Sequence, residues 1–132
     1  MLTESDLKKN KLFQLLDKLN LSSDEYLIMG SGIMFMLGIR PIKDMADLDL
    51  WVKDSAFEKI KELGNVQHDE EWDCDYIFLF DKRIEVWNGW GPKVYSKTNR
   101  KTHYFFNILQ KKAIYIGKYS FEDIHDVLEW KI

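Results

Sequence analysis

Two aspartates, Asp47 and Asp49, are separated by a single leucine at the start of an apolar segment that runs to residue 52. We predict a β-strand over 48–52, whose period of two places both carboxylates on one face and Leu48 and Leu50 on the other. Two neighbouring carboxylates repel unless a cation lies between them, and such oxygen ligands suit Mg²⁺, which shares itself with substrate phosphates. Alternating aspartates also occur on solvated strand faces, so the pair indicates a metal site without establishing one.

A third carboxylate, Glu85, lies between Ile84 and Val86, so it shares the polar face of its segment with Arg83 and Trp87. A single glutamate on a hairpin is as often simply exposed. If this strand lies beside the Asp49 strand, three carboxylates converge, which is enough for a two-metal phosphoryl-transfer site.

The turn Gly30-Ser31-Gly32 follows the apolar segment 26–29 and precedes the apolar segment 33–37. We predict a buried strand, then a helix that ends at Gly38. Backbone N–H groups at such a turn can bind phosphate, and the Ser31 hydroxyl adds a donor, although glycine is also common there for steric reasons.

The loop before the acidic strand carries Arg40 and Lys43, which could donate to a triphosphate or simply face solvent. Asp44 is an alternative first acid, but its spacing places it on the other face from Asp49, so we prefer Asp47.

The remaining elements complete an α+β domain, in which helices flank a small mixed β-sheet. We expect a single domain over 1–132, without repeats or linkers. Its other predicted elements are a helix over 4–19, a helix over 56–63 with Ser55 and Glu58 as a capping box and Gly64 at its end, a hairpin of 76–80 and 83–87 with a turn at Asp81-Lys82, and a helix over 121–130 capped by Ser120.

Bulk composition is that of a globular protein with 45% hydrophobic and 31% charged residues, and the net charge of −3 argues against bulk binding to polyanions. Cys74 is the single cysteine, no apolar run reaches membrane-spanning length, and no signal segment is evident, so we expect a cytoplasmic protein without a membrane partner. The oligomeric state stays open.

Three further groups have residue types that could bind ligands. Lys93, Lys97, Arg100, Lys101 and His103 form a basic cluster near aromatic residues, which suits either a nucleic-acid acceptor or a solvated loop. The acidic stretch 68–75 favours a solubilising surface. Glu122 and His125 are one helical turn apart and could ligate a metal, but an exposed helix face explains them as well.

Gly30-Ser31, Gly38-Ile39-Arg40, Asp47-Leu48-Asp49 and Arg83-Ile84-Glu85-Val86 occur in an order that resembles the minimal nucleotidyltransferases of the DNA polymerase beta superfamily, of the abortive-infection or antitoxin type. The stretch 113–117, followed by 121–124 and Lys131, looks like the closing segment of that family. The resemblance covers most of 26–131 through short motifs.

This resemblance implies an Mg²⁺-dependent enzyme that transfers a nucleoside monophosphate from a nucleoside triphosphate to a hydroxyl of an unknown acceptor, either nucleic acid or protein. It implies that Gly30 and Ser31 contact phosphates, that Asp47 and Asp49 bind metal, and that Glu85 completes the metal site and orients or activates the acceptor oxygen.

One departure from the family pattern is the distance between Ser31 and Asp47, which 15 intervening residues make longer than usual. Inactive relatives exist, so a non-catalytic binding or regulatory module, such as an antitoxin-like one, is the alternative. An unrelated α+β interaction domain is a third reading, and it requires Asp49 and Glu85 on separate faces.

Overall fold

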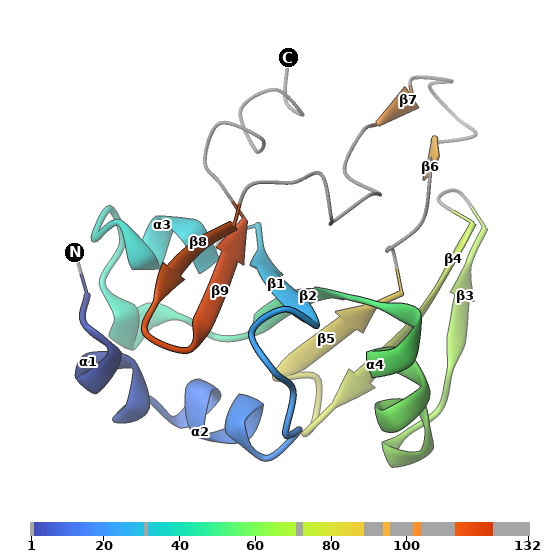
Figure 1. Cartoon of the computed structure of the whole chain (residues 1–132), viewed down its shortest axis with the longest axis horizontal. Helices are drawn as coiled ribbons and strands as arrows, with labels where there is room; N and C mark the ends of the chain where they lie inside the picture. The colour runs from blue at the N-terminus through green and yellow to red at the C-terminus, as the bar shows by residue number, and fades with distance from the viewer. Residues whose placement is uncertain are drawn as a thin grey trace.

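The structure is a computed structural model that describes residues 2–30, 32–70, 73–88 and 113–122, together with the backbone of 94–95 and 102–103. Figure 1 shows its elements in chain order. They are α1 (Glu4–Lys8), α2 (Lys11–Asp17), β1 (Tyr26–Met29), α3 (Gly32–Met36), the 3₁₀ turn η1 (Ile42–Asp44), β2 (Leu48–Val52), α4 (Asp54–Ile60), the 3₁₀ turn η2 (Lys61–Leu63), β3 (Gln67–Asp69), β4 (Cys74–Leu79), β5 (Ile84–Trp87), β6 (Val94–Tyr95), β7 (Thr102–His103), β8 (Ala113–Ile116) and β9 (Tyr119–Glu122).

Seven strands form one mixed sheet in the order β3-β4-β5-β2-β1-β9-β8. β1 pairs with β2 antiparallel, whereas β2 pairs with β5 and β1 pairs with β9 in parallel. β4 and β5 form the predicted antiparallel hairpin. The predicted α+β class with a mixed sheet is therefore confirmed.

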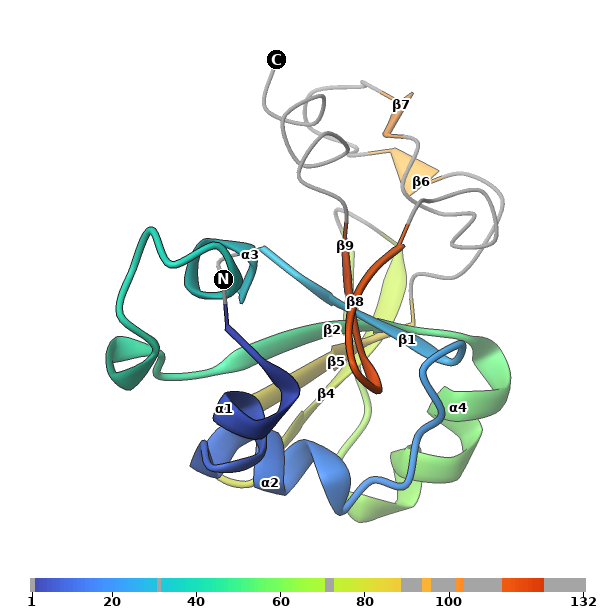
Figure 2. The same cartoon turned by 60° about the vertical axis from the view of Figure 1, so that its left-hand side comes forward.

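One face of the sheet is apolar and packs against helices. Leu48, Leu50 and Val52 are at most 1% exposed, as expected for alternate residues of a strand that is buried on one side. α1, α2 and α4 lie on the same side of the sheet in Figures 1 and 2. The polar alternates of β2 and β5 therefore point away from these helices.

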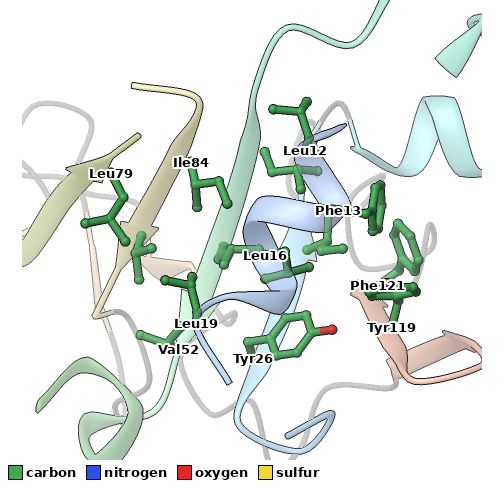
Figure 3. Close-up of a cluster of buried hydrophobic side chains, with 14 of the residues drawn as sticks. Leu12, Phe13, Leu16, Leu19, Tyr26, Val52, Leu79, Ile84, Tyr119 and Phe121 are labelled. Atoms are coloured by element: carbon green, nitrogen blue, oxygen red, sulfur yellow. The ribbon is translucent and has the colours of Figure 1, made fainter. Parts of the chain in front are cut away.

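The core between α2 and the sheet is closed by aromatic packing. Figure 3 shows Leu12, Phe13 and Leu16 of α2 directed at side chains of the sheet. Phe13 meets Tyr119 edge to face, with ring centroids 4.8 Å apart, and lies 6.3 Å from Phe121. Since both partners belong to β9, these contacts fix the position of α2 over the C-terminal strand pair.

α3 ends as the sequence predicts. Gly38 has φ +76°, its N–H donates to Phe35 O, and the N–H of Ile39 donates to Met34 O. These two bonds close the helix with a left-handed glycine. The backbone at the start of α3 lies close to Ile28 of β1, because a Cβ on Gly32 would stand 2.5 Å from Ile28 Cγ2.

The predicted single helix over 4–19 is wrong in its continuity, because it is two helices. Asn10 is extended, and its side chain accepts from the N–H groups of Leu12 and Phe13, so it caps α2 and breaks the chain after α1. The apolar spacing continues across this break, which is why periodicity alone did not reveal it.

The predicted capping box at Ser55 is also wrong. α4 begins at Asp54 with Lys53 as its N-cap, which makes no side-chain capping bond. Ser55 is therefore inside the helix, and Gly64 follows η2 in an extended conformation.

The predicted helix at 121–130 is wrong at its first two residues, which belong to β9, and 123–130 lie outside the described residues. Ser120 is a strand residue whose hydroxyl donates to Ser23 O rather than a helix cap. The predicted turn at Asp81-Lys82 is confirmed, with both residues and Phe80 at positive φ. Within the described residues, no helix has the length and apolarity needed to cross a membrane.

Candidate functional site

The turn after β1 lies beside the carboxylate of Asp49. Met29 is the antiparallel partner of Asp49, so the chain leaves β1 next to this side chain. Gly30 has φ +66°, and a Cβ built on it would stand 3.8 Å from Asp49 Oδ2. The left-handed conformation favours glycine here, and it brings the turn close to the carboxylate.

Asp49 and Glu85 face each other across neighbouring strands. They are partners in the parallel register of β2 and β5, so they lie on the same face of the sheet. This face is the one opposite Leu48 and Leu50. The reading as an unrelated interaction domain required them on separate faces, and the structure does not fulfil that requirement.

The pair concentrates negative charge in a partly buried place. Burial raises the pKa of Asp49 to about 7, with further contributions from the charges of Glu85 and Asp47 and from a hydrogen bond with Glu85. Asp49 Oδ1 is buried and accepts no hydrogen bond from any residue that the structure describes. An unsatisfied carboxylate oxygen beside a second carboxylate is a position that a cation would stabilise.

Asp47 is exposed and lies immediately before β2, which starts at Leu48. The ladder of β2 and β5 begins with Leu48 and Ile84, so Asp47 is not one of its paired residues. Its charge still acts on Asp49.

Glu85 is held by a neighbour on its own strand. The indole Nε1 of Trp87 donates to Glu85 Oε1 at 2.9 Å. Trp87 in turn stacks on Tyr76 of β4, with centroids 4.5 Å apart and planes at 18°, and meets Trp51 of β2 at 6.2 Å. A row of aromatic side chains therefore borders the carboxylates on the same face.

The other predicted phosphate-binding residues are not brought to the carboxylates by any described contact. Ser31 lies outside the described residues. The guanidinium of Arg40 lies 4.9 Å from the ring centroid of Phe35, and Lys43 is exposed on η1. No hydrogen bond or ion pair in the described part of the chain connects Arg40 or Lys43 to Asp49 or Glu85.

A metal site made of protein side chains alone is not present in the described ranges, because no three His, Cys, Asp or Glu side chains are grouped to hold an ion. The Asp49–Glu85 pair nevertheless fits Mg²⁺ in its donor type and in its unpartnered oxygen. Mg²⁺ is commonly held by one or two carboxylates together with substrate phosphates. These two residues would hold the ion, with Asp47 adding charge at the exposed side.

Comparison of the chain with protein-family models, with curated proteins and with solved structures gives no match. A function for this chain therefore has to be inferred from the geometry of the site.

The remaining candidates do not form ligand sites in the described residues. His68 contacts Asp75 at 2.8 Å and Asp73 at 3.0 Å, and the hydrogen bond with Asp75 raises its pKa. These two acids are therefore paired with His68, which is the register partner of Asp75 in β3 and β4. Burial raises the pKa of Cys74 to about 11, which disfavours a reactive thiolate.

Two sequence candidates fall partly outside the described chain. Glu122 is buried in β9 instead of exposed on a helix, and His125 lies outside the described residues. In the basic cluster, only the backbone of His103 is described, in β7.

Sequence reasoning placed Trp87 on the polar face with Glu85 but did not predict its contact with Glu85, and it gave no role to Tyr76. The signal that could have found them is the aromatic residue two positions after each acid, Trp51 after Asp49 and Trp87 after Glu85, together with the alternate aromatics Tyr76 and Phe78 of β4. Only the strand register shows that these rings meet.

Proposed function

We propose that this chain is a nucleotidyltransferase-like domain that transfers a nucleoside monophosphate from a nucleoside triphosphate to a hydroxyl acceptor. The observation that carries the proposal is the placement of Asp49 between the Gly30 turn and Glu85. Gly30 approaches one oxygen of Asp49, and Glu85 is its partner on the next strand. The order of strand, glycine turn, helix, acidic strand and later acidic strand is the order that the resemblance implies.

Each of these residues has a role that follows from its position. The turn at Gly30 lies beside the carboxylate of Asp49, where a triphosphate bound through Mg²⁺ would lie. Asp49 and Glu85 would hold the cation, and Glu85 would also orient the acceptor hydroxyl. Mg²⁺ bound there would activate that hydroxyl and neutralise charge on the departing pyrophosphate.

The test compares Mg²⁺-dependent nucleotide binding in wild type and in the double variant Asp47→Ala/Asp49→Ala. Each nucleoside triphosphate is added with Mg²⁺, and thermal unfolding and pyrophosphate release are measured. A ligand at 100 times its Kd stabilises a folded protein by about 2.7 kcal/mol, so the wild type should gain several degrees and the double variant should gain nothing.

The matched control is Asp44→Ala, because Asp44 lies in the same loop, on η1, and is exposed. It should respond to nucleotides as the wild type does. Equal responses of wild type and the double variant, including no stabilisation of either, would refute the enzymatic proposal.

A non-catalytic binding or regulatory module is the second candidate. It is favoured by the position of Asp47 before the strand and by the lack of a three-ligand metal group in the described residues. This candidate predicts that Mg²⁺ and nucleoside triphosphates leave the unfolding temperature unchanged, or that a nucleotide stabilises the chain equally with and without Mg²⁺.

A further inference from the structure

The Trp87 indole makes a hydrogen bond to one of the two proposed metal ligands. Its Nε1 lies 2.9 Å from Glu85 Oε1, and both side chains project from the same face of β5 because they are two residues apart. A hydrogen bond to an ionised carboxylate is stronger than one between neutral groups. The bond therefore fixes which oxygen of Glu85 points along its own strand.

The indole is itself held in one orientation by neighbouring strands. Tyr76 is the antiparallel partner of Trp87 on β4, and Trp51 is its parallel partner on β2. The Tyr76 ring is nearly parallel to the indole at 4.5 Å, and the Trp51 ring meets it at 62°. Rotation of the indole away from Glu85 would break both contacts, so the N–H donor is rigid.

This rigidity matters because Asp49 and Glu85 repel each other when both are ionised. Without a fixed partner, Glu85 would relieve the repulsion by turning away from Asp49. A binding cation would then have to turn Glu85 back toward Asp49. Because Trp87 occupies Oε1, the second oxygen of Glu85 stays available toward Asp49, its register partner. A ligand held in place before binding loses less entropy and binds more tightly.

We propose that Trp87 is a positioning residue that holds Glu85 in the orientation in which it and Asp49 bind a divalent cation together. This inference rests on the proposed function, because it assigns a role in the same site. Hydrogen-bond partners of metal ligands typically change metal affinity 10- to 100-fold when they are removed. Trp87→Phe keeps an aromatic ring for stacking and removes only the N–H donor and the larger ring.

The experiment measures Mn²⁺ affinity by titration calorimetry and by the electron paramagnetic resonance signal of free Mn²⁺, without nucleotide and without turnover. Trp87→Phe should weaken Mn²⁺ binding about tenfold or more. Tyr76→Phe is the control: it keeps the ring that stacks on Trp87 and removes only the hydroxyl that donates to Gln67. It should bind Mn²⁺ as the wild type does, although the substitution lies in the same aromatic stack.

A second measurement does not depend on the metal. In a ¹H–¹⁵N spectrum, the Trp87 indole resonance, assigned by its absence in Trp87→Phe, should move in Glu85→Gln and stay in place in Asp44→Asn. An indole resonance that is unaffected by Glu85→Gln would overturn the inference at once.

The outcomes separate this inference from the proposed function. If wild type binds Mn²⁺, Asp49→Asn abolishes binding and Trp87→Phe binds as wild type does, the positioning role is refuted and the metal site stands. If wild type does not bind Mn²⁺ even with a nucleoside triphosphate present, the proposed metal site fails and the positioning role fails with it.

Discussion

At the scale of single residues, the site combines two neighbouring carboxyl groups, Asp49 and Glu85, that repel each other on an otherwise well-packed sheet. Asp49 is on β2, whose alternate residues Leu48 and Leu50 are buried on the other face, and its Oδ1 has no hydrogen-bond partner in the described part of the chain. Burial and the neighbouring negative charges both disfavour the ionised form of Asp49. Such pairs of close carboxylates occur where a cation or proton is part of the function.

The first prediction concerns Asp49 and pH. The pKa of Asp49 is 3.8 in its ordinary state and about 7 in the fold, so the folded protein binds a proton that the unfolded chain releases between these values. Stability contributed by this group is therefore present at low pH and is lost as pH rises through about 4 to 7. Without divalent cations, Asp49→Asn should exceed wild type in stability by about 1–2 kcal/mol at about pH 8, after allowance for solvent screening, and should equal it near pH 4.

Urea unfolding at the two pH values measures this difference, with EDTA present. Asp44→Asn, an exposed acid in the same loop, should match wild type at both. An Asp49→Asn protein that is less stable than wild type at about pH 8 would contradict the proposed repulsion between Asp49 and Glu85.

At the scale of elements, short local signals decided where helices begin and end. Gly38 ends α3 through a left-handed turn that the sequence predicted, whereas Asn10 divides the first helix because its side chain competes for the backbone N–H groups. The apolar positions of both helices still face one core, so Leu7 and Leu12 are buried on either side of the break.

The second prediction tests this cap. Asn10→Ala removes the acceptor for the N–H groups of Leu12 and Phe13 and should destabilise the protein by about 1 kcal/mol. Asn10→Asp keeps the acceptor and should stay within about 0.5 kcal/mol of wild type. Denaturant unfolding monitored by circular dichroism distinguishes the two. Equal stability of Asn10→Ala and wild type would mean that the break in the helix is imposed by packing instead of by the cap.

At the scale of the whole molecule, the C-terminal strand pair completes the sheet beside β1. β9 lies parallel to β1, and its Tyr119 hydroxyl donates to both oxygens of Asp17, at 3.0 and 3.1 Å, at the end of α2. Lys118 also contacts Asp17, at 2.9 Å. The helix that covers the sheet and the strand that extends it are therefore joined across most of the chain.

The third prediction measures this connection. Tyr119→Phe removes the hydrogen bonds to a charged acceptor and should destabilise the protein by about 1–2 kcal/mol. Tyr115→Phe is the matched control because Tyr115 is 56% exposed on the neighbouring strand β8, so the loss of its hydroxyl should change stability by less than about 0.5 kcal/mol. Thermal and urea unfolding give both values. A Tyr119→Phe protein as stable as the control would show that the hydroxyl adds nothing measurable to the aromatic packing on Phe13 and the Lys118–Asp17 contact.

The sequence by itself determined the local pattern of the site. A period of two separates Leu48 and Leu50 from Asp49, and it separates Ile84 and Val86 from Glu85, because successive side chains of a strand point to opposite faces. The role of Gly30 in the turn after β1 was also predictable, because a chain that turns sharply at the end of a strand commonly needs a glycine there.

Only the tertiary structure decided which strands are neighbours. The parallel pairing of β2 with β5 makes Asp49 and Glu85 partners, and no local preference specifies it, since it joins segments far apart in the chain. Asp47 lies immediately before Leu48, the first residue of this pairing. The same pairing also brings Trp87 between Tyr76 and Trp51, where the indole can hold Glu85.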